Sequence, residues 1–329
     1  MANEFTVLLA QKEGQSARGL EAGGVSLHGQ PFYKSGNTGL AESLEAVAEA
    51  GLLLVPTYAL VAGRAFAGKD SSAWQEYHDS RAERLTLLDA NGIIATKGDV
   101  YVADVQNGGL FVHDPSRVRA AVTDGTLVNR ALKLEQKEVD AFLDAYNRND
   151  TAGLSQLVHG ERFAFSGNYA AFLDASQAPG FLAGMDATYV VLRPVAEARA
   201  LTSDYQSTES QKDNPDIIIA SGGKAAAEKM LDKVTEFEWE QFGSWHDGYK
   251  NPNTGRVVDL YIRDGGVSGC RGLDIDGHGV GEAPEARAAF FSGKVIDPLA
   301  LKVQEAMRGS PVDHADGVLL YVPLVQRRQ

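Results

Sequence analysis

The stretch DNPDIIIASGGKAAAEKMLDKV, residues 213–234, carries the clearest pattern in the chain. Its three consecutive isoleucines, Ile217–Ile219, form a short apolar run between turn residues, which favours a strand buried on both faces. Two glycines then relax the backbone. An alanine-rich segment follows, with apolar residues at helical spacing. We therefore predict a buried strand that passes through a tight turn directly into a helix.

The turn between these two elements is a candidate anion-binding site. It consists of Ser221, Gly222, Gly223 and Lys224. A helix that starts at the carboxyl end of a buried strand points free N–H groups at whatever binds there, and the lysine would add positive charge. The sequence contains no complete glycine-rich phosphate motif at this point. The alternative is an ordinary connection between a strand and a helix.

Patterns on either side of this stretch predict a mixture of helices and strands. Helical spacing predicts helices at 40–50, 71–88, 116–122, 135–148, 169–175 and 298–307. Apolar or alternating runs predict strands at 52–55, 58–61, 101–105, 110–112, 187–192, 256–262 and 317–322. We expect the strands at 187–192 and 217–220 to be neighbours. The mixture indicates an α+β, or mixed α/β, fold with a central mixed sheet and flanking helices.

Two features bear on the domain organisation. Residues 13–39 are rich in glycine and polar side chains, which predicts a long irregular N-terminal arm. Turn residues at 147–153 mark a boundary between an N-terminal α+β region, 1–150, and a C-terminal α/β region, 151–329. A length of 329 residues fits two domains, and one large domain is the open alternative.

The composition narrows the class of protein. Hydrophobic residues make up 44% and charged residues 23% of the chain, which is typical of a soluble globular protein. A formal net charge of −13 argues against general nucleic-acid binding and against docking on anionic membranes. The sequence has neither an apolar run long enough to span a membrane nor the pattern of a signal peptide. We therefore expect a cytoplasmic protein, or a virion protein assembled inside a cell.

Histidines stand beside aspartates unusually often. Three of the seven directly precede one, at His78, His113 and His246. The pair His246-Asp247 lies between aromatic residues in FGSWHDGY. Imidazole and carboxylate groups together can exchange protons with a substrate, so we predict that this pair is catalytic. The alternative is a turn that covers one edge of the core.

A glycine-rich stretch, DGGVSGCRGLDIDGHGVGE at residues 264–282, suggests a metal site. Asp274 and Asp276 alternate, and so share one face if the chain is extended. Together with His278 they offer oxygen and nitrogen ligands for a divalent metal ion. The alternative is a flexible loop. Cys270 is the single cysteine, which excludes an intrachain disulfide and a cysteine-rich zinc site.

Two functional hypotheses follow from these patterns. The first is a soluble enzyme that acts on a small anionic substrate by metal-assisted or general acid–base chemistry. The second is a structural or assembly protein without catalytic activity, such as a phage or virus-like virion component, which suits the acidic, Ala- and Gly-rich composition. The partner of the protein is a small-molecule substrate under the first hypothesis and further copies of the chain under the second. A homo-oligomer is expected under both hypotheses.

Overall fold

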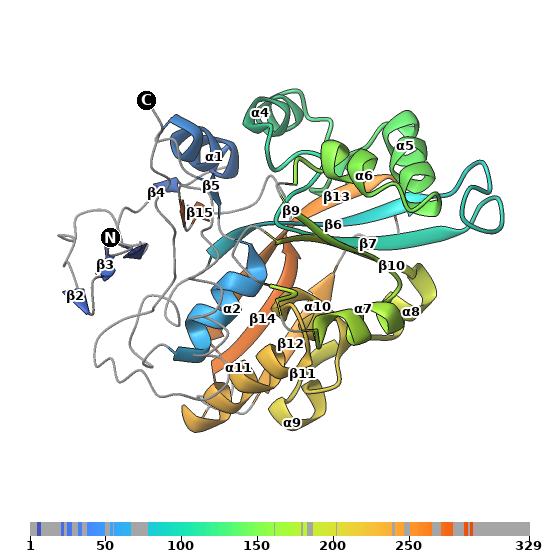
Figure 1. The fold of residues 1–329 in the computed structure, drawn as a ribbon. Coiled ribbons are helices and arrows are strands. Elements are labelled where there is room, and N and C mark those ends of the chain that lie inside the picture. Colours follow the sequence, from blue (N-terminus) through green and yellow to red (C-terminus); the bar gives the residue numbers. More distant parts are fainter. Residues whose placement is uncertain are drawn as a thin grey trace, which may run out of the picture.

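The computed structural model describes residues 5–7, 21–22, 25–27, 32–34, 38–49, 53–54, 56–66, 78–160, 162–178, 180–182, 187–201, 203–238, 241–246, 251–264, 271–278, 286–288 and 290–291. A mixed sheet of eleven described strands forms the centre (Figure 1). Helices lie against both of its faces, so these parts of the chain build three layers. The predicted fold class, a mixed sheet with flanking helices, is confirmed.

Eight strands form the main path of this sheet. In spatial order they are β11 (Ser203–Ser207), β12 (Gln241–His246), β14 (Arg271–His278), β13 (Thr254–Asp264), β6 (His78–Leu88), β7 (Val100–Gln106), β10 (Ala187–Pro194) and β9 (Arg162–Gly167). Short strands pair beside this path, namely β4 (Phe32–Lys34), β8 (Leu132–Lys133) and β15 (Ala286–Ala288). Separate small sheets join β1 (Phe5–Val7), β2 (Glu21–Ala22) and β3 (Val25–Leu27), and β5 (Leu53–Leu54) with β16 (Phe290–Phe291).

The sheet contains both parallel and antiparallel pairs. β12 runs parallel to β14, and β10 parallel to β9. The strands β14, β13, β6, β7 and β10 form antiparallel pairs in turn. β6 and β7 precede residue 150, whereas their partners β13 and β10 follow it. Both halves of the chain therefore contribute to one sheet, and the proposed division at residue 150 stays a prediction.

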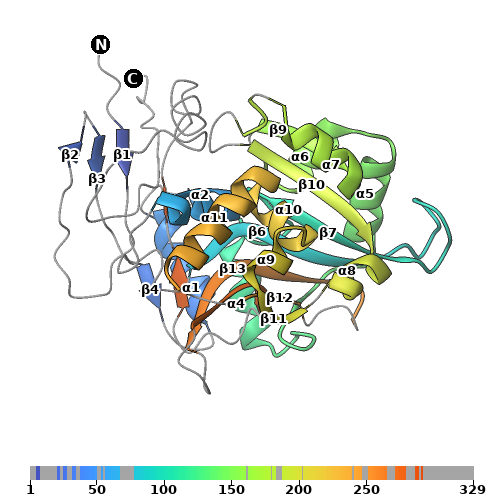
Figure 2. The same cartoon turned by 90° about the horizontal axis from the view of Figure 1, so that it is seen from below.

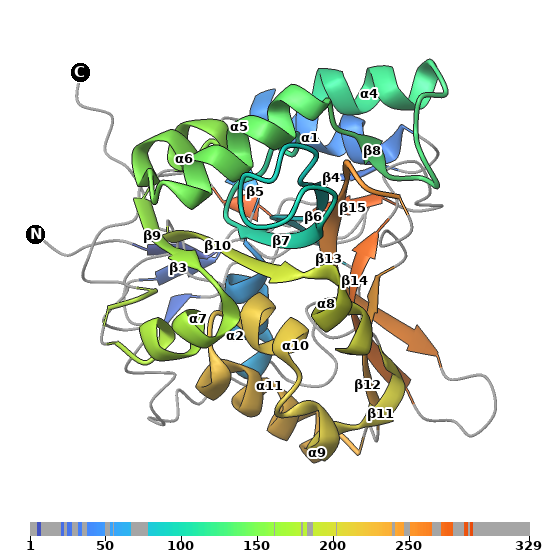
Figure 3. The same ribbon diagram turned by 90° about the vertical axis from the view of Figure 1, so that its right-hand side faces the viewer.

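Four helices cover one face of the sheet. They are α1 (Gly39–Glu49), α4 (Pro115–Thr123), α5 (Gln136–Asn147) and α6 (Thr151–Leu157). Figure 3 shows α4, α5 and α6 on one side of the strands. Their apolar residues pack on Leu85, Ala103 and Val190 of the central strands, and all of these are buried. The amphipathic pattern of each helix thus faces the sheet.

The other face is covered by α2 (Thr57–Phe66), α7 (Tyr169–Ser176), α10 (Pro215–Ser221) and α11 (Lys224–Glu236) (Figure 2). These helices share a second apolar cluster with Ala82, Tyr189 and Val191 of the sheet. Two short helices, α8 (Val195–Leu201) and α9 (Thr208–Gln211), flank β10 and β11. The described residues contain no helix of the length and apolar character that a membrane crossing requires.

The isoleucine run is helical, and the predicted strand at 217–220 is wrong. Asn214 caps α10 by accepting the N–H of Asp216 at 2.9 Å, and Pro215 occupies the first turn. Gly222, in a left-handed conformation, ends the helix. The isoleucines are buried, as expected, because α10 packs against α2, α11 and the sheet. The neighbours of β10 are β7 and β9 instead.

Three further predictions of secondary structure are corrected. The predicted helix at 71–88 is the strand β6 from His78 onward, while residues 71–77 lie outside the described part. The predicted strand at 58–61 belongs to helix α2. Residues 110–112 form a turn rather than the return strand of a hairpin, because the carboxylate of Glu83 takes up their N–H groups.

The remaining predictions of elements fall into two groups. The helices at 40–50, 116–122, 135–148 and 169–175 and the strands at 101–105, 187–192 and 256–262 are confirmed, and β5 lies within the predicted strand 52–55. The helix at 298–307 and the strand at 317–322 lie outside the described residues. Within the predicted arm, 13–39, the structure describes three strands of two or three residues and the start of α1.

Candidate functional site

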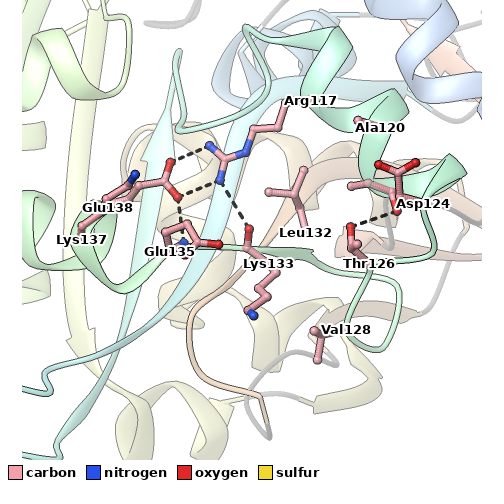
Figure 4. Close-up of a pocket in the computed structure, with 11 residues that line it drawn as sticks. Arg117, Ala120, Asp124, Thr126, Val128, Leu132, Lys133, Glu135, Lys137 and Glu138 are labelled. Atoms are coloured by element: carbon pink, nitrogen blue, oxygen red, sulfur yellow. Dashed lines mark hydrogen bonds and ion pairs between the residues drawn. The ribbon is translucent and has the colours of Figure 1, made fainter.

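A groove lies between α4, β8 and the first turn of α5, and we call it the α4–α5 groove (Figure 4). Its volume is about 700 Å³. Leu132 and Val128 supply part of an apolar floor. Six charged side chains line the rest, namely Arg117, Asp124, Lys133, Glu135, Lys137 and Glu138. A cavity of this size is large enough for a small ligand, and its charged lining favours a polar or charged one.

Arg117 holds the walls of this groove together. Its guanidinium donates to both carboxylate oxygens of Glu138, at 2.7 and 2.9 Å. It also donates to the carbonyl oxygens of Leu110, at 3.2 Å, and Lys133, at 3.4 Å. Glu138 in turn accepts the N–H of Glu135 at 2.8 Å. The charge of Arg117 is therefore neutralised within the wall, and its role there is to fix four segments of backbone.

Lys133 and Lys137 differ from Arg117 in having no ion pair with any described residue. Both side chains are exposed at the groove. Lys137 is the second residue of α5, so the positive end of the helix dipole lies beside it, where the carboxylate of Glu135 caps the N–H of Glu138. Asp124, by contrast, lies at the C-terminus of another helix, as the C-cap of α4. One end of the groove thus favours an anion, and the other end is acidic.

A buried carboxylate supports the groove from behind. Glu83 of β6 is fully buried and accepts three consecutive backbone N–H groups. Its Oε2 accepts from Leu110 at 2.7 Å, and its Oε1 accepts from Phe111 at 2.8 Å and from Val112 at 2.5 Å. Burial raises the pKa of Glu83 to about 7, although the three N–H groups and the charge of Arg117 act to lower it.

Two histidines stack beside the same loop. The rings of His113 and His159 lie 3.4 Å apart, and His113 Nδ1 lies 3.0 Å from the carbonyl oxygen of Gly109. Burial, together with the charge of His159, lowers the pKa of His113 to about 4. Asp114 turns away to cap α4, since it accepts the N–H of Arg117 at 3.0 Å. The pair His113-Asp114 therefore consists of a packed ring and a helix cap.

Four more charged side chains are buried on the opposite face of the sheet. Arg84 Nε lies 2.6 Å from Asp104, and Arg193 Nη2 lies 2.6 Å from Asp104 and 2.7 Å from Asp216. Arg84 also approaches Asp216 at 3.5 Å. Each of these side chains is at most 2% exposed. The two positive and two negative charges balance, so the cluster joins β6, β7, β10 and α10 without net charge.

The predicted anion-binding residues lie together at the junction of α10 and α11. Ser221 is the last residue of α10, and Gly223 rather than Ser221 occupies the N-cap position of α11. Ser221, Gly222 and Gly223 are buried. Lys224 is exposed, and its ammonium lies 2.6 Å from a carboxylate oxygen of Asp213. Anion binding at this junction stays a prediction.

The predicted catalytic and metal-binding residues fall on adjacent strands. His246 ends β12, and β14 contains Asp274, Asp276 and His278. The register pairs His246 with Gly277, and so brings the two segments side by side. Asp247 and the side chains of these strands lie outside the described part. Among the side chains that are described, no group of three His, Cys, Asp or Glu could hold a metal ion. Catalysis and metal binding here stay predictions.

The sequence patterns did not single out the residues of the α4–α5 groove or Glu83. One local signal was present, because Glu135 and Glu138 have the spacing of a helix cap at the start of α5. It marks the positive end of a helix beside Lys133 and Lys137. Glu83 had no local signal, since its partners lie 27 to 29 residues away.

Comparisons with known proteins give a fold but no family. No protein-family model matches the chain, and neither does any curated protein. A solved structure described as "Accommodation of massive sequence variation in Nanoarchaeota by the C-type lectin fold" is similar, with a TM-score of 0.52 and 18% sequence identity. The match covers 84% of this chain and 100% of that chain. At this identity the likeness concerns the fold alone, and the chain therefore has a fold similar to that of the C-type lectins.

Proposed function

We propose that the chain is a recognition protein that binds a small anionic ligand in the α4–α5 groove. The observation that carries this proposal is that Lys133, at the end of β8, and Lys137, in the first turn of α5, line the same groove. Both ammonium groups lack an ion pair with a described residue, and the first turn of α5, with the positive end of its dipole, lines the same cavity. Helix N-termini and lysines bind carboxylate, sulfate and phosphate groups in this manner.

The charges of the groove restrict the ligand further. Three basic residues and three acidic residues line it, but Arg117 and Glu138 neutralise each other. Lys133 and Lys137 remain at the α5 end, with Glu135 near them. Asp124 remains at the C-terminus of α4, where the helix dipole is also negative. The proposed ligand has an anionic group at the α5 end and hydrogen-bond donors, such as hydroxyl or ammonium groups, toward Asp124.

The scaffold supports a binding role as well. The solved structure with a similar fold is described as one in which the C-type lectin fold accommodates massive sequence variation. In the present chain the cluster around Asp216 buries its charges on the face of the sheet opposite the groove. Substitution of the exposed groove residues Lys133 and Lys137 would leave those contacts intact. A stable frame with a variable surface suits recognition of a ligand.

Binding of inorganic sulfate tests the proposal, because sulfate is a dianion at every pH near neutrality. Titration calorimetry on the wild type is expected to show binding, and the double substitution of Lys133→Ala and Lys137→Ala is expected to weaken it by about tenfold. Each lysine in this exposed setting contributes about 0.5–1 kcal/mol. The matched control is Lys97→Ala, which removes an exposed lysine in the β6–β7 loop. Equal losses in both variants, or no sulfate binding by the wild type, would refute the proposal.

A metal-assisted or acid–base reaction at β12 and β14 is the second candidate function. The pairing of His246 with Gly277 favours it, because the backbone brings the predicted catalytic and metal-binding segments together. A metal ion bound only to the native state would raise its stability by roughly 2.7 kcal/mol at a hundredfold excess over the dissociation constant. Thermal melts are then expected to shift when a chelator is added, and to shift less in Asp274→Ala or Asp276→Ala. Melts without any response to chelator would remove the metal from this candidate.

A further inference from the structure

Leu110 connects the buried carboxylate of Glu83 to the wall of the groove. Its N–H donates to Glu83 Oε2 at 2.7 Å, and its carbonyl oxygen accepts from Arg117 Nη1 at 3.2 Å. Arg117 then holds Glu138 at the start of α5. Gly109 precedes Leu110, and a side chain there would overlap the carboxyl group of Glu83. The loop therefore packs directly against the carboxylate. A change in the hydrogen bond between the Leu110 N–H and Glu83 reaches the groove through the bond between the Leu110 carbonyl oxygen and Arg117.

We propose that the protonation state of Glu83 regulates ligand binding in the α4–α5 groove, with Leu110 as the link. This inference rests on the proposed function of the groove. Glu83 is a positioning residue in this scheme, because it is buried behind the loop and cannot touch a ligand. The ionised form holds the loop and keeps Arg117 in place, whereas the protonated form releases Leu110.

The two carboxylate oxygens differ in how readily they take up a proton. Oε1 accepts two N–H groups, from Phe111 and Val112, while Oε2 accepts only one, from Leu110. A proton taken from solvent therefore forms its O–H bond at Oε2, and no other covalent bond changes. The protonated oxygen keeps a lone pair but is a weaker acceptor than a carboxylate oxygen, and its O–H occupies part of the space beside the N–H of Leu110. The hydrogen bond from Leu110 is thereby weakened, and Leu110, with the carbonyl oxygen that accepts from Arg117, is held less firmly.

The charged groups around Glu83 make this transition local. Within the described structure, Arg117 of α4 is the charged group that acts on the carboxylate. The residues paired with Glu83 in the sheet, Val105 of β7 and Val257 of β13, are apolar. Arg81, two residues earlier on β6, donates to Asn107 and to the backbone of His159. Protonation thus removes one negative charge and leaves Arg117 paired with Glu138.

The titration falls within the physiological range. Burial raises the pKa of Glu83 to about 7 and lowers that of His113 to about 4. His113 therefore remains neutral over the pH range in which Glu83 takes up its proton. The pKa of Glu83 is higher in the folded state than in the unfolded state. Between the unfolded-state and folded-state pKa values of Glu83, the native state therefore binds the proton more tightly than the unfolded state does. The contribution of Glu83 to global stability is therefore greatest at low pH and is lost as the pH rises through about 7. Loosening of the loop at low pH is accordingly a local event in a folded protein.

Amide hydrogen exchange followed by NMR between pH 5.5 and 8.5 tests the link without any ligand. The protection factor of the Leu110 amide is expected to fall by about fivefold or more as the pH drops below 7, as for the loss of one hydrogen bond. Phe111 and Val112 are expected to change less. An internal control comes from Asp89, which is buried and accepts the N–H groups of Ile93 and Ile94 at 2.7 and 2.8 Å.

Asp89 serves as the control because its pKa is lowered, whereas the pKa of Glu83 is raised. Although burial acts in the opposite direction, the surrounding N–H groups hold the pKa of Asp89 below its ordinary value. Protection of Ile93 and Ile94 is therefore expected to stay constant over the same range. A Leu110 protection factor that is equally constant would overturn the proposal.

Calorimetric titration with sulfate over the same pH range tests the effect on the groove. Affinity is expected to fall by about fivefold as the pH drops below 7, in parallel with Leu110 protection. Glu83→Gln, which places an amide where the protonated carboxyl would be, is expected to bind weakly at every pH. His159→Gln is expected to keep the pH dependence of sulfate affinity. If this variant lost that pH dependence, the effect would belong to the histidine and the proposal would be overturned.

The outcomes separate the two proposals. Measurable sulfate affinity that does not vary with pH, in a protein whose Leu110 protection does vary, would overturn regulation and leave the proposed binding function standing. No sulfate binding at pH 8 would overturn the binding function and the regulation together. If Glu83→Gln fails to fold, the exchange and titration data on the wild-type protein still decide the question.

Discussion

Replacement of Asp216 by alanine is expected to lower the free energy of unfolding by about 3–5 kcal/mol, the largest effect of any single substitution considered for this chain. The aspartate is fully buried and lies 2.7 Å from Arg193 and 3.5 Å from Arg84. Asp104 would then be the one carboxylate of this cluster that faces the two buried guanidinium groups. A buried charge without its partner is far more costly than the pair itself contributes. Chemical denaturation, monitored by circular dichroism, measures the loss.

Asp213→Ala is the matched control, since it removes an aspartate three residues earlier that also forms an ion pair. That side chain is 82% exposed, and its partner Lys224 is 49% exposed. The expected loss is much smaller than that of Asp216→Ala, because solvent screens the exposed pair. If the two variants lost equal stability, the buried cluster would not be an important determinant of the fold.

The buried cluster also accounts for the orientation of α10. Its members come from four elements, with Arg84 on β6, Asp104 on β7, Arg193 on β10 and Asp216 on α10. The carboxylate of α10 can satisfy both arginines only when one face of this helix meets the sheet. Ile217, Ile218 and Ile219 then fill the space between the sheet and the neighbouring helices. The same segment thus supplies both the charge that specifies the contact and the apolar area that stabilises it.

Elements with strong local signals could be predicted from sequence. The helix at 116–122 has a proline in its first turn and an aspartate cap at Asp114, and the helix at 135–148 has one continuous apolar face. The strand at 187–192 reads ATYVVL, rich in β-branched and aromatic residues, and in the structure it is buried within the sheet. In each of these cases the residues that determine the element lie inside it or next to it.

The isoleucine run shows how two local signals can compete. Its β-branched residues favour a strand, but this preference depends strongly on context. Asn214 and Pro215 before the run, and Gly222 after it, are the start and stop signals of a helix. Both sets of signals are present in the sequence. The helix is preferred because the caps satisfy its end groups and Asp216 gains two buried partners.

The groove and the strand β6 could not be predicted in this manner. β6 contains Arg81, Glu83 and Arg84, and charged residues at this density indicate an exposed helix when they are considered alone. All three are buried in the structure because their partners arrive from distant segments, such as Asp216, which is 132 residues from Arg84. The α4–α5 groove similarly depends on how α4 packs beside α5. Long-range pairing of this kind leaves no trace in the local pattern of either segment.

Gly109→Ala is expected to destabilise the protein by about 3 kcal/mol and to abolish the pH-dependent protection of Leu110. A β-carbon at this position would overlap Glu83 Cδ and Oε1, which are themselves fixed in the core. The loop has to move outward, with a strain of about 1–3 kcal/mol and the weakening of up to three hydrogen bonds to Glu83. Thermal melts and the Leu110 exchange rate measure the two effects.

Gly98→Ala provides the comparison that isolates the contact with Glu83. Gly98 has a φ of +97°, which disfavours alanine, but a β-carbon there would have no neighbour within 4 Å. Its expected cost is about 1 kcal/mol from backbone strain alone, with no change at Leu110. If both variants lost the same stability and Leu110 kept its protection in Gly109→Ala, the loop could be held without its close fit to the carboxylate. The link between Glu83 and Arg117 would then lack a physical basis, because the rigidity of Leu110 is what transmits a change at the buried oxygen to the wall of the groove.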